Sequence, residues 1–279
     1  MSSQFEETIN SHNDFYRNAQ EYWAEIPATV DGMLGGFSSI SQKDINASKL
    51  LLKQLFRSNN PPGNDYALDC GAGIGRVTKH LLIDSFNKVD LVEQNGNFLN
   101  KAKAYIGSQA DEKIGNLYST GLQSFEPDER KYDVIWMQWV LGHLTDPDLM
   151  ICLSKCKKAL RPNGVIVVKE NITSSGSEEW DKNDSSFTRP MHLLKQIFKF
   201  SGLHCCKQLK QQDFPKSLYP VYMFVLKPEI NEHYKLFGIN CSTSSVISSE
   251  DQKKTDEEIT SSSAEDKSPG NSVTNCDRS

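Results

Sequence analysis

The sequence contains no long run of apolar residues. Among its 279 residues, no stretch approaches the roughly 18–20 apolar residues that a bilayer-spanning helix needs. Its start, MSSQFEETIN, is polar, whereas a secretory signal would be basic and then apolar. We therefore expect no membrane partner and a soluble, intracellular protein of the nucleus and cytoplasm.

An excess of positive charge and the Cys-x-x-Cys spacing are also missing. Lys and Arg number 31 against 36 Asp and Glu, and the resulting net charge of −5 argues against a nucleic-acid partner. The seven cysteines form no Cys-x-x-Cys pair of the kind used in zinc sites and redox dithiols. We expect reduced thiols and no metal.

Aromatic residues are absent from residues 240–279, which are rich in Ser, Asp, Glu and Lys. This segment holds eight acidic and four basic side chains, so it carries −4 of the total charge of −5. Such a composition cannot bury enough apolar surface to offset the entropy of ordering the chain. We expect 229–279 to be a disordered, solubilising tail, although phosphorylation or partner docking would also suit it.

The rest of the chain alternates short aliphatic runs with longer amphipathic stretches, which is typical of βαβ units on a parallel sheet. Helices are expected over 13–25 and 41–56, and another should begin at Thr145, as an N-cap, and end before the turn at 161–164. The last two strands should form an antiparallel hairpin at one sheet edge. The expected strands are 66–69, 88–92, 116–120, 132–136, 165–169, 203–210 and 221–226.

These elements predict an α/β, Rossmann-like fold with a seven-stranded, mostly parallel sheet. A flexible N-terminus is expected over 1–12, followed by one domain over 13–228. Within that domain, a helical N-terminal cap covers 13–60 and the Rossmann-like core covers 61–228.

A glycine-rich loop follows the first expected strand, in the string Asp69-Cys-Gly-Ala-Gly-Ile-Gly-Arg76. Its spacing differs from the dinucleotide fingerprint G-x-G-x-x-G, because the third glycine comes one residue early. Glu93 ends the next strand, about 20 residues on, where a carboxylate grips a ribose diol and repels a 2′-phosphate. The residues disfavour NADP and leave NAD, S-adenosylmethionine, or a purely structural turn as alternatives.

The segment from Asp69 to Gly75 resembles the first motif of class I S-adenosylmethionine-dependent methyltransferases. Longer strings resemble the protein α-N-terminal methyltransferases, which methylate the free α-amine of proteins beginning X-Pro-Lys or X-Pro-Arg after methionine removal. The resemblance spans about 14–227, with departures at Glu93, Glu170 and Pro190 and one extra residue within 174–182. The strings are Tyr22-Trp23, Ile26-Pro27, Val30-Asp-Gly-Met-Leu-Gly-Gly36, Ala67–Arg76, Tyr132-Asp-Val-Ile-Trp-Met-Gln-Trp139, Gly142-His-Leu-Thr-Asp146 and Leu160-Arg-Pro-Asn-Gly164.

The resemblance implies S-adenosylmethionine as the cofactor and assigns its binding residues. Arg76 would pair with the methionine carboxylate, Glu93 would hold the ribose, and Leu122 and Gln123 would flank the adenine. The full set of expected cofactor residues is Gly71, Arg76, Glu93, Gln94, Leu122, Gln123 and Gln138.

Direct SN2 transfer to an amine requires alignment and deprotonation, and an α-amine has an ordinary pKa of about 7.7–8.0. His143 follows the fourth core strand, where the carboxyl ends of parallel strands form a site, so it is a candidate base. By resemblance, Asp184 shares the base role and Asn171 anchors the first substrate residue. Alternatively, His143 has no catalytic role and lies at the N-terminus of a helix, where it is hydrogen-bonded to the backbone.

A methylated amine and a proline at substrate position two both call for aromatic and apolar walls. Asp181 and Asp184, on a polar loop or helix start, would attract the cationic amine and the Lys or Arg at position three, or would simply be solvated. Instead of contacting the substrate, the tryptophans could simply pack in the hydrophobic core. The expected substrate residues are Trp23, Leu34, Ile40, Trp139, Asn171, Asp181, Asp184 and Tyr219.

Two other functions are compatible with the glycine loop. One is a class I methyltransferase acting on a small-molecule amine or an internal lysine, which would leave Asp181, Asp184 and Trp23 without a role. The other is a catalytically silent module that binds N-termini. The sequence leaves open the number of methyl groups added and the physiological substrates, and a monomer is expected.

Overall fold

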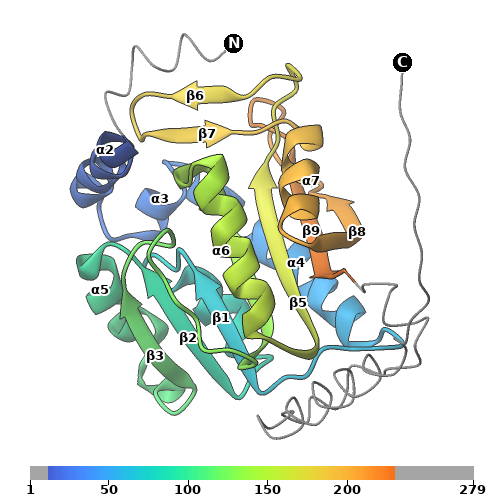
Figure 1. The fold of residues 1–279 in the computed structure, drawn as a ribbon. Helices are drawn as coiled ribbons and strands as arrows, with labels where there is room; N and C mark the ends of the chain where they lie inside the picture. The colour runs from blue at the N-terminus through green and yellow to red at the C-terminus, as the bar shows by residue number, and fades with distance from the viewer. Residues whose placement is uncertain (1–11, 230–279) are drawn as a thin grey trace, which may run out of the picture. The chain divides into compact units, whose positions relative to one another are not determined.

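A computed structural model gives the structure of the protein, and it describes residues 12–229. A seven-stranded sheet in the order β3-β2-β1-β4-β5-β9-β8 forms its centre (Figure 1). The first five strands of this order are parallel, and β9 runs antiparallel to both β5 and β8. The strands are β1 Tyr66–Cys70, β2 Lys88–Glu93, β3 Ile114–Ser119, β4 Tyr132–Gln138, β5 Leu160–Asn171, β8 Leu203–Lys210 and β9 Val221–Pro228. The predicted mostly parallel sheet with an edge hairpin is thus confirmed.

The predicted strand bounds agree with the structure within a few residues, except at the start of β5. That strand begins at Leu160 rather than at residue 165. Its register against β4 shifts between Tyr132 and Val134, and Asn163 has a φ of 64°. The predicted turn at 161–164 therefore lies inside the strand as an irregular segment, because backbone pairing resumes on both sides of it.

The helices surround this sheet as the amphipathic stretches predicted. Helix α6 begins after Thr145, whose hydroxyl accepts a hydrogen bond from the Asp148 N–H, so the expected N-cap is present. Helices α2 and α4 reproduce the two predicted for the N-terminal cap. The longer helices are α2 His12–Glu25, α4 Ser41–Phe56, α5 Gly96–Ile106, α6 Asp146–Ala159 and α7 Met191–Phe200, and the short ones are α3 Val30–Met33, η1 Ser38–Ile40, η2 Thr78–Leu82, η3 Ser108–Ala110 and η4 Leu141–His143.

Two hydrophobic clusters cover the two faces of the sheet. Successive β4 side chains alternate between them: Ile135 and Met137 belong to the cluster with α6 and α7, whereas Val134 and Trp136 belong to the cluster with α4 and α5. Figure 1 shows α6 and α7 on one side of the sheet and α4 on the other. Because central strands are buried on both faces, their carboxyl ends are left to form the site.

A small hairpin, β6 Glu179–Asp181 and β7 Ser186–Thr188, pairs outside the main sheet. The prediction of a polar loop or helix start is wrong for Asp181, which ends β6, whereas Asp184 does lie in a turn. Trp180 contacts Phe187 with ring centroids 4.7 Å apart, and Phe187 stacks on Phe15 of α2 at 5.5 Å. Figure 1 shows the hairpin beside α2. An aromatic partner more than a hundred positions away stabilises strands too short for a local pattern to reveal.

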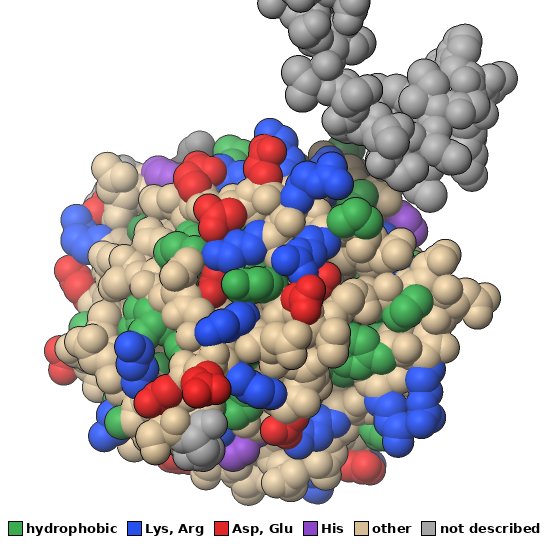
Figure 2. All heavy atoms as spheres, turned by 90° about the horizontal axis from the view of Figure 1, so that it is seen from below, with side chains coloured by type: hydrophobic (Ala, Val, Ile, Leu, Met, Phe, Trp, Pro, Cys, Tyr) green, Lys and Arg blue, Asp and Glu red, His purple; other side chains and the backbone are tan. Residues whose placement is uncertain are grey.

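The expected flexible segments, 1–12 and 229–279, lie almost entirely outside the described residues. Within residues 12–229, no helix is long and apolar enough to cross a bilayer. Figure 2 shows one face of the molecule, on which acidic and basic side chains are interspersed rather than gathered by sign.

Candidate active site

A cavity with about 910 Å³ of empty space lies at the carboxyl ends of β1, β2 and β4, where the strand order reverses. All seven residues expected to bind the cofactor line it, together with Trp23, Trp139 and His143. The remaining expected substrate and catalytic residues do not line it. These are Leu34, Ile40, Asn171, Asp181, Asp184 and Tyr219.

The glycine loop after β1 approaches this cavity with its backbone. Gly71 and Gly73 have φ values of 68° and 55°, which side-chain-bearing residues rarely adopt. A Cβ on Gly71 would lie 2.5 Å from Val140 Cγ2, and one on Gly73 would lie 2.5 Å from Met33 Sδ. The loop therefore requires glycine for both its conformation and its close contacts.

Two buried carboxyl groups hold the loop in place. Asp69 accepts hydrogen bonds from the Thr78 N–H at 3.1 Å and hydroxyl at 2.6 Å, and burial raises the pKa of Asp69 to about 6. Glu93 accepts the Gly73 N–H at 2.9 Å through Oε2 and the Asn95 N–H at 2.8 Å through Oε1. Burial also raises the pKa of Glu93. Glu93 also lines the cavity, and a carboxylate can accept a further hydrogen bond from a hydroxyl donor.

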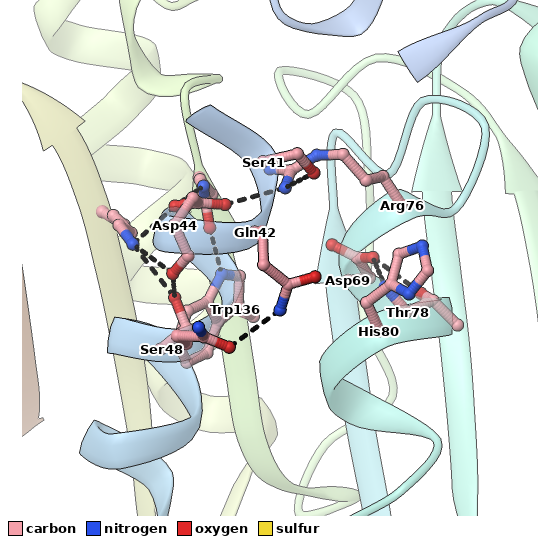
Figure 3. A network of polar contacts seen from close by, with 12 residues as sticks. Ser41, Gln42, Asp44, Ser48, Asp69, Arg76, Thr78, His80 and Trp136 are labelled. Carbon is pink, nitrogen blue, oxygen red and sulfur yellow. Dashed lines mark hydrogen bonds and ion pairs between the residues drawn. The ribbon is translucent and has the colours of Figure 1, made fainter. Parts of the chain in front are cut away.

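Arg76 lines the cavity from the other end of the loop. Its Nη1 lies 2.8 Å from Asp44 Oδ2, and its guanidinium carbon lies 5.6 Å from the centroid of the Trp139 ring. Figure 3 shows Asp44 on helix α4, linked to Arg76. Sequence reasoning missed Asp44, and it also missed Lys169, although a lysine at the end of the apolar run 165–168 was a visible signal.

His143 ends η4 at the cavity wall. Its Nε2 accepts a hydrogen bond from the Trp23 indole N–H at 3.1 Å, which assigns the ring proton to Nδ1. Burial lowers the pKa of His143, while the nearby charge of Asp184 opposes that shift. The imidazole is therefore neutral near pH 7, as a proton acceptor must be.

Glu170 and Arg189 hold the segment that carries His143, and sequence reasoning gave neither a role. Glu170 Oε1 accepts the N–H groups of Val140 and Leu141, both at 2.8 Å. Arg189 donates to the carbonyls of Leu141 at 2.8 Å and Leu144 at 2.6 Å. Burial raises the pKa of Glu170 to about 7. These four bonds fix the backbone on both sides of the η4 turn.

The β6–β7 hairpin carries both acidic residues expected to meet the substrate. Asp181 ends β6, and Asp184 lies in the turn, where its Oδ1 accepts a hydrogen bond from the Ser186 hydroxyl at 2.7 Å. Burial raises the pKa of Asp184, and the charge of His143 opposes that shift. Tyr219 is 41% exposed and donates its hydroxyl hydrogen to Glu179 Oε2 at 2.5 Å. Asp184 is thus electrostatically linked to His143, whereas Tyr219 is exposed and does not line the cavity.

Three other expected residues do not line the cavity. Asn171 ends β5 opposite Val221 of β9. Leu34 and Ile40 are buried in the cap, with 8% and 6% of their surface exposed, and Leu34 directly follows the cavity-lining Met33.

Taken together, this strand order, the glycine loop and the carboxylate after β2 define a class I S-adenosylmethionine-dependent methyltransferase. The chain belongs to the family of AdoMet dependent proline di-methyltransferases, whose pattern matches residues 11–227.

Named relatives agree with this assignment. The chain is 47% identical over 223 residues to the N-terminal Xaa-Pro-Lys N-methyltransferase 1 of Xenopus tropicalis, covering 79% of this chain and 99% of the relative. It is 48% identical over 222 residues to the alpha N-terminal protein methyltransferase 1 of Drosophila melanogaster, covering 79% of each. A solved SAM-dependent methyltransferase from Leishmania major is 36% identical with a TM-score of 0.72, covering 76% of this chain and 83% of that one.

The cavity residues fit S-adenosylmethionine. Because Gly71 and Gly73 carry no Cβ atoms, a ligand can approach the backbone of the loop closely, and Glu93 presents acceptors for ribose hydroxyls. Among the described residues, Trp139 Nε1 and His143 Nδ1 are buried polar atoms without a hydrogen-bond partner, and both residues line the cavity. Buried donors of this kind are normally satisfied, and the Trp139 indole N–H would gain a partner from a ligand in the cavity. Trp139 also has a φ of 52°, a strained conformation typical of functional sites.

Proposed function

We propose that this methyltransferase acts on the free α-amino group of proteins that begin Xaa-Pro-Lys or Xaa-Pro-Arg after methionine removal. The observation that carries the proposal is a single cavity whose wall combines the glycine loop with a buried neutral histidine and two tryptophans. The names of the relatives that share nearly half of its residues support the same substrate class.

The expected cofactor residues would hold S-adenosylmethionine along the strand ends. Arg76 would bind its carboxylate, Glu93 its ribose, and Leu122 and Gln123 its adenine, with Gly71, Gln94 and Gln138 completing the pocket. When bound, the cofactor supplies a methyl group on a sulfonium, which is a good leaving group. The protein then has to place a neutral amine in line with that methyl group.

His143 and Asp184 would supply the neutral amine. The Nε2 lone pair of His143 points to Trp23, whose indole N–H occupies it at 3.1 Å. An incoming ammonium group would replace this indole donor and pass its proton to Nε2. Asp184 would stabilise the imidazolium that forms, because its negative charge opposes the lowering of the His143 pKa by burial.

The remaining expected residues would bind the peptide. Asp181 and Asp184 would attract the Lys or Arg at position three, and Asn171 would bond to the backbone of the first residue. Trp23 and Trp139 would contact the amine and the proline, with Leu34, Ile40 and Tyr219 farther along the channel.

Peptide methylation tests this proposal directly. We would incubate the full chain with S-adenosylmethionine and a Ser-Pro-Lys peptide, and count added methyl groups by mass spectrometry. An N-acetylated copy and a Pro-to-Ala copy serve as matched controls. Methylation confined to the free Ser-Pro-Lys peptide is expected. Transfer to the acetylated copy would indicate an internal-lysine acceptor and contradict the proposal.

Two further outcomes separate the alternatives. Cofactor binding without transfer to any peptide would indicate a methyltransferase that acts on a different acceptor. Peptide binding without cofactor binding would indicate a silent recognition module. A monomer located in the nucleus and cytoplasm, and the domain bounds 13–228, are parts of the same proposal, testable by sedimentation, fractionation and limited proteolysis.

A further inference from the structure

A buried group of polar side chains lies behind the cavity wall, and we call Asp44, Arg76, Gln138 and Lys169 the Asp44 cluster. Asp44 Oδ1 lies 2.5 Å from Lys169 Nζ and accepts a hydrogen bond from Gln138 Nε2 at 2.9 Å. Asp44 Oδ2 lies 2.8 Å from Arg76 Nη1. Asp44 and Lys169 have no exposed surface, whereas Arg76 and Gln138 also line the cavity. The cluster therefore connects the helical cap, through α4, with the glycine loop and with β4 and β5.

The cluster binds Arg76 by one end only. Within residues 12–229, the Arg76 guanidinium donates its hydrogen bonds from Nη1 alone. One goes to Asp44 Oδ2 at 2.8 Å and the other to the Ser41 hydroxyl at 3.4 Å. Its face packs over Trp139. The Nη2 and Nε donors are thus left for a bidentate partner in the cavity, in the fork geometry that suits a carboxylate.

The charges of the cluster sum to +1, with Asp44 negative and Arg76 and Lys169 positive. Lys169 Nζ also donates to the Asp44 carbonyl and the Ser48 hydroxyl, both at 3.0 Å, which fully orders its ammonium. Asp69 is the next carboxyl group, and it bonds to Thr78 rather than to Arg76. If Lys169 were absent, Asp44 would neutralise Arg76, and the buried site would offer an anion no net attraction.

We propose that Asp44 and Lys169 are positioning residues for the cofactor: Asp44 anchors the Arg76 guanidinium, and Lys169 neutralises Asp44 so that Arg76 keeps its charge for the methionine carboxylate. This inference rests on the proposed function, because it takes the carboxylate-binding role of Arg76 from it. It adds that the N-terminal cap, through Asp44, participates in cofactor binding.

The test compares two ligands that differ only in the amino-acid part. S-adenosylhomocysteine carries the carboxylate, whereas 5′-methylthioadenosine lacks the whole amino-acid end. The readout is the ratio of their dissociation constants, measured by calorimetry on the full chain. In Lys169→Met this preference for S-adenosylhomocysteine should fall by about tenfold or more, because a charged hydrogen bond is weakened. Affinity for 5′-methylthioadenosine should stay nearly constant.

A double variant, Asp44→Asn with Lys169→Met, removes both fully buried charges and restores the net +1, which then belongs to Arg76 alone. Its preference should lie between those of Lys169→Met and the unchanged chain, because charge returns while the ionic anchor is lost. Equal preferences in all three proteins would overturn the proposal. If Lys169→Met does not fold, the double variant is sufficient by itself: a ligand preference equal to that of the unchanged chain would overturn the proposal.

Two controls separate the possible failures. Lys131→Met breaks a partly buried ion pair, with Asp90 at 2.8 Å, outside the cavity, and it should lower stability without changing the ligand preference. Arg76→Met should abolish the preference. If Arg76→Met has no effect, the proposed cofactor site fails. If Arg76→Met abolishes the preference and the Lys169 variants do not change it, only the present inference fails.

Discussion

His143 combines burial with an unpartnered ring nitrogen at the wall of the cavity. Burial disfavours its charged form, so the pKa of His143 lies below the ordinary histidine value of about 6.5. The imidazole is therefore already neutral below pH 6.5.

Replacing this histidine should remove the proton acceptor. We expect His143→Gln to lower kcat about a hundredfold, with a smaller change in cofactor affinity. In the unchanged chain, kcat should fall below about pH 6.5 as His143 becomes protonated, and this decrease should be absent from the pH profile of the variant. His192→Gln is the matched control and should behave like the unchanged chain. A full kcat in His143→Gln would contradict the base role.

Glu170 makes stability depend on pH. Burial raises its pKa from 4.5 to about 7, so between these values the folded state holds a proton that the unfolded state has lost. Stability must therefore fall as pH rises through this window, by up to about 3 kcal/mol. Glu170→Gln should make the decrease smaller, as measured by urea unfolding at pH 5 and pH 8, while Asp69, whose pKa is also raised by burial, keeps its own share. Glu129→Gln, at an exposed position, should keep it.

At the scale of elements, the β6–β7 hairpin places Asp184 near His143. The hairpin is attached to α2 by the aromatic contacts of Phe187 with Phe15 and by the Ser185 hydroxyl, which donates to the Phe15 carbonyl at 2.9 Å. Its position therefore depends on the N-terminal helix rather than on the main sheet. The cofactor residues, in contrast, belong to loops at the strand ends.

This division predicts a selective effect. Trp180→Ala removes the ring that contacts Phe187 at 4.7 Å, so it should loosen the hairpin and raise the peptide KM about tenfold. Affinity for S-adenosylhomocysteine should change less than about twofold. Lys182→Gln, at an exposed position of the same turn, is the control. A parallel loss of peptide and cofactor binding would show that the hairpin supports the whole site.

At the scale of the whole molecule, the family match ends at residue 227, and the part of the chain that the structure describes, 12–229, supplies the complete set of expected cofactor residues. We therefore expect a chain ending at Glu229 to keep kcat and both KM values within about twofold of the full chain, measured with the same peptide. A large loss of activity would assign the segment 230–279 a role in catalysis or substrate binding.

Sequence patterns were sufficient for the sheet and for the cofactor loop. Residues 203–210 and 41–56 were predicted with the observed bounds, because apolar periodicity is a local property. The glycine spacing at 71–75 and the position of Glu93 likewise depend only on neighbouring residues. The hairpin was missed because its three-residue strands are polar and gain their packing from Phe15.

The sequence by itself therefore determined the order of elements, the mostly parallel sheet and the residues at the strand ends. Only the tertiary structure decided that Asp44 meets Lys169, 125 positions away, and that Glu170 and Arg189 hold the turn of His143. The physical reason is that such contacts depend on which helix covers which strand. A buried charge is stable only beside its partner, and the chain path, not the local pattern, brings that partner near.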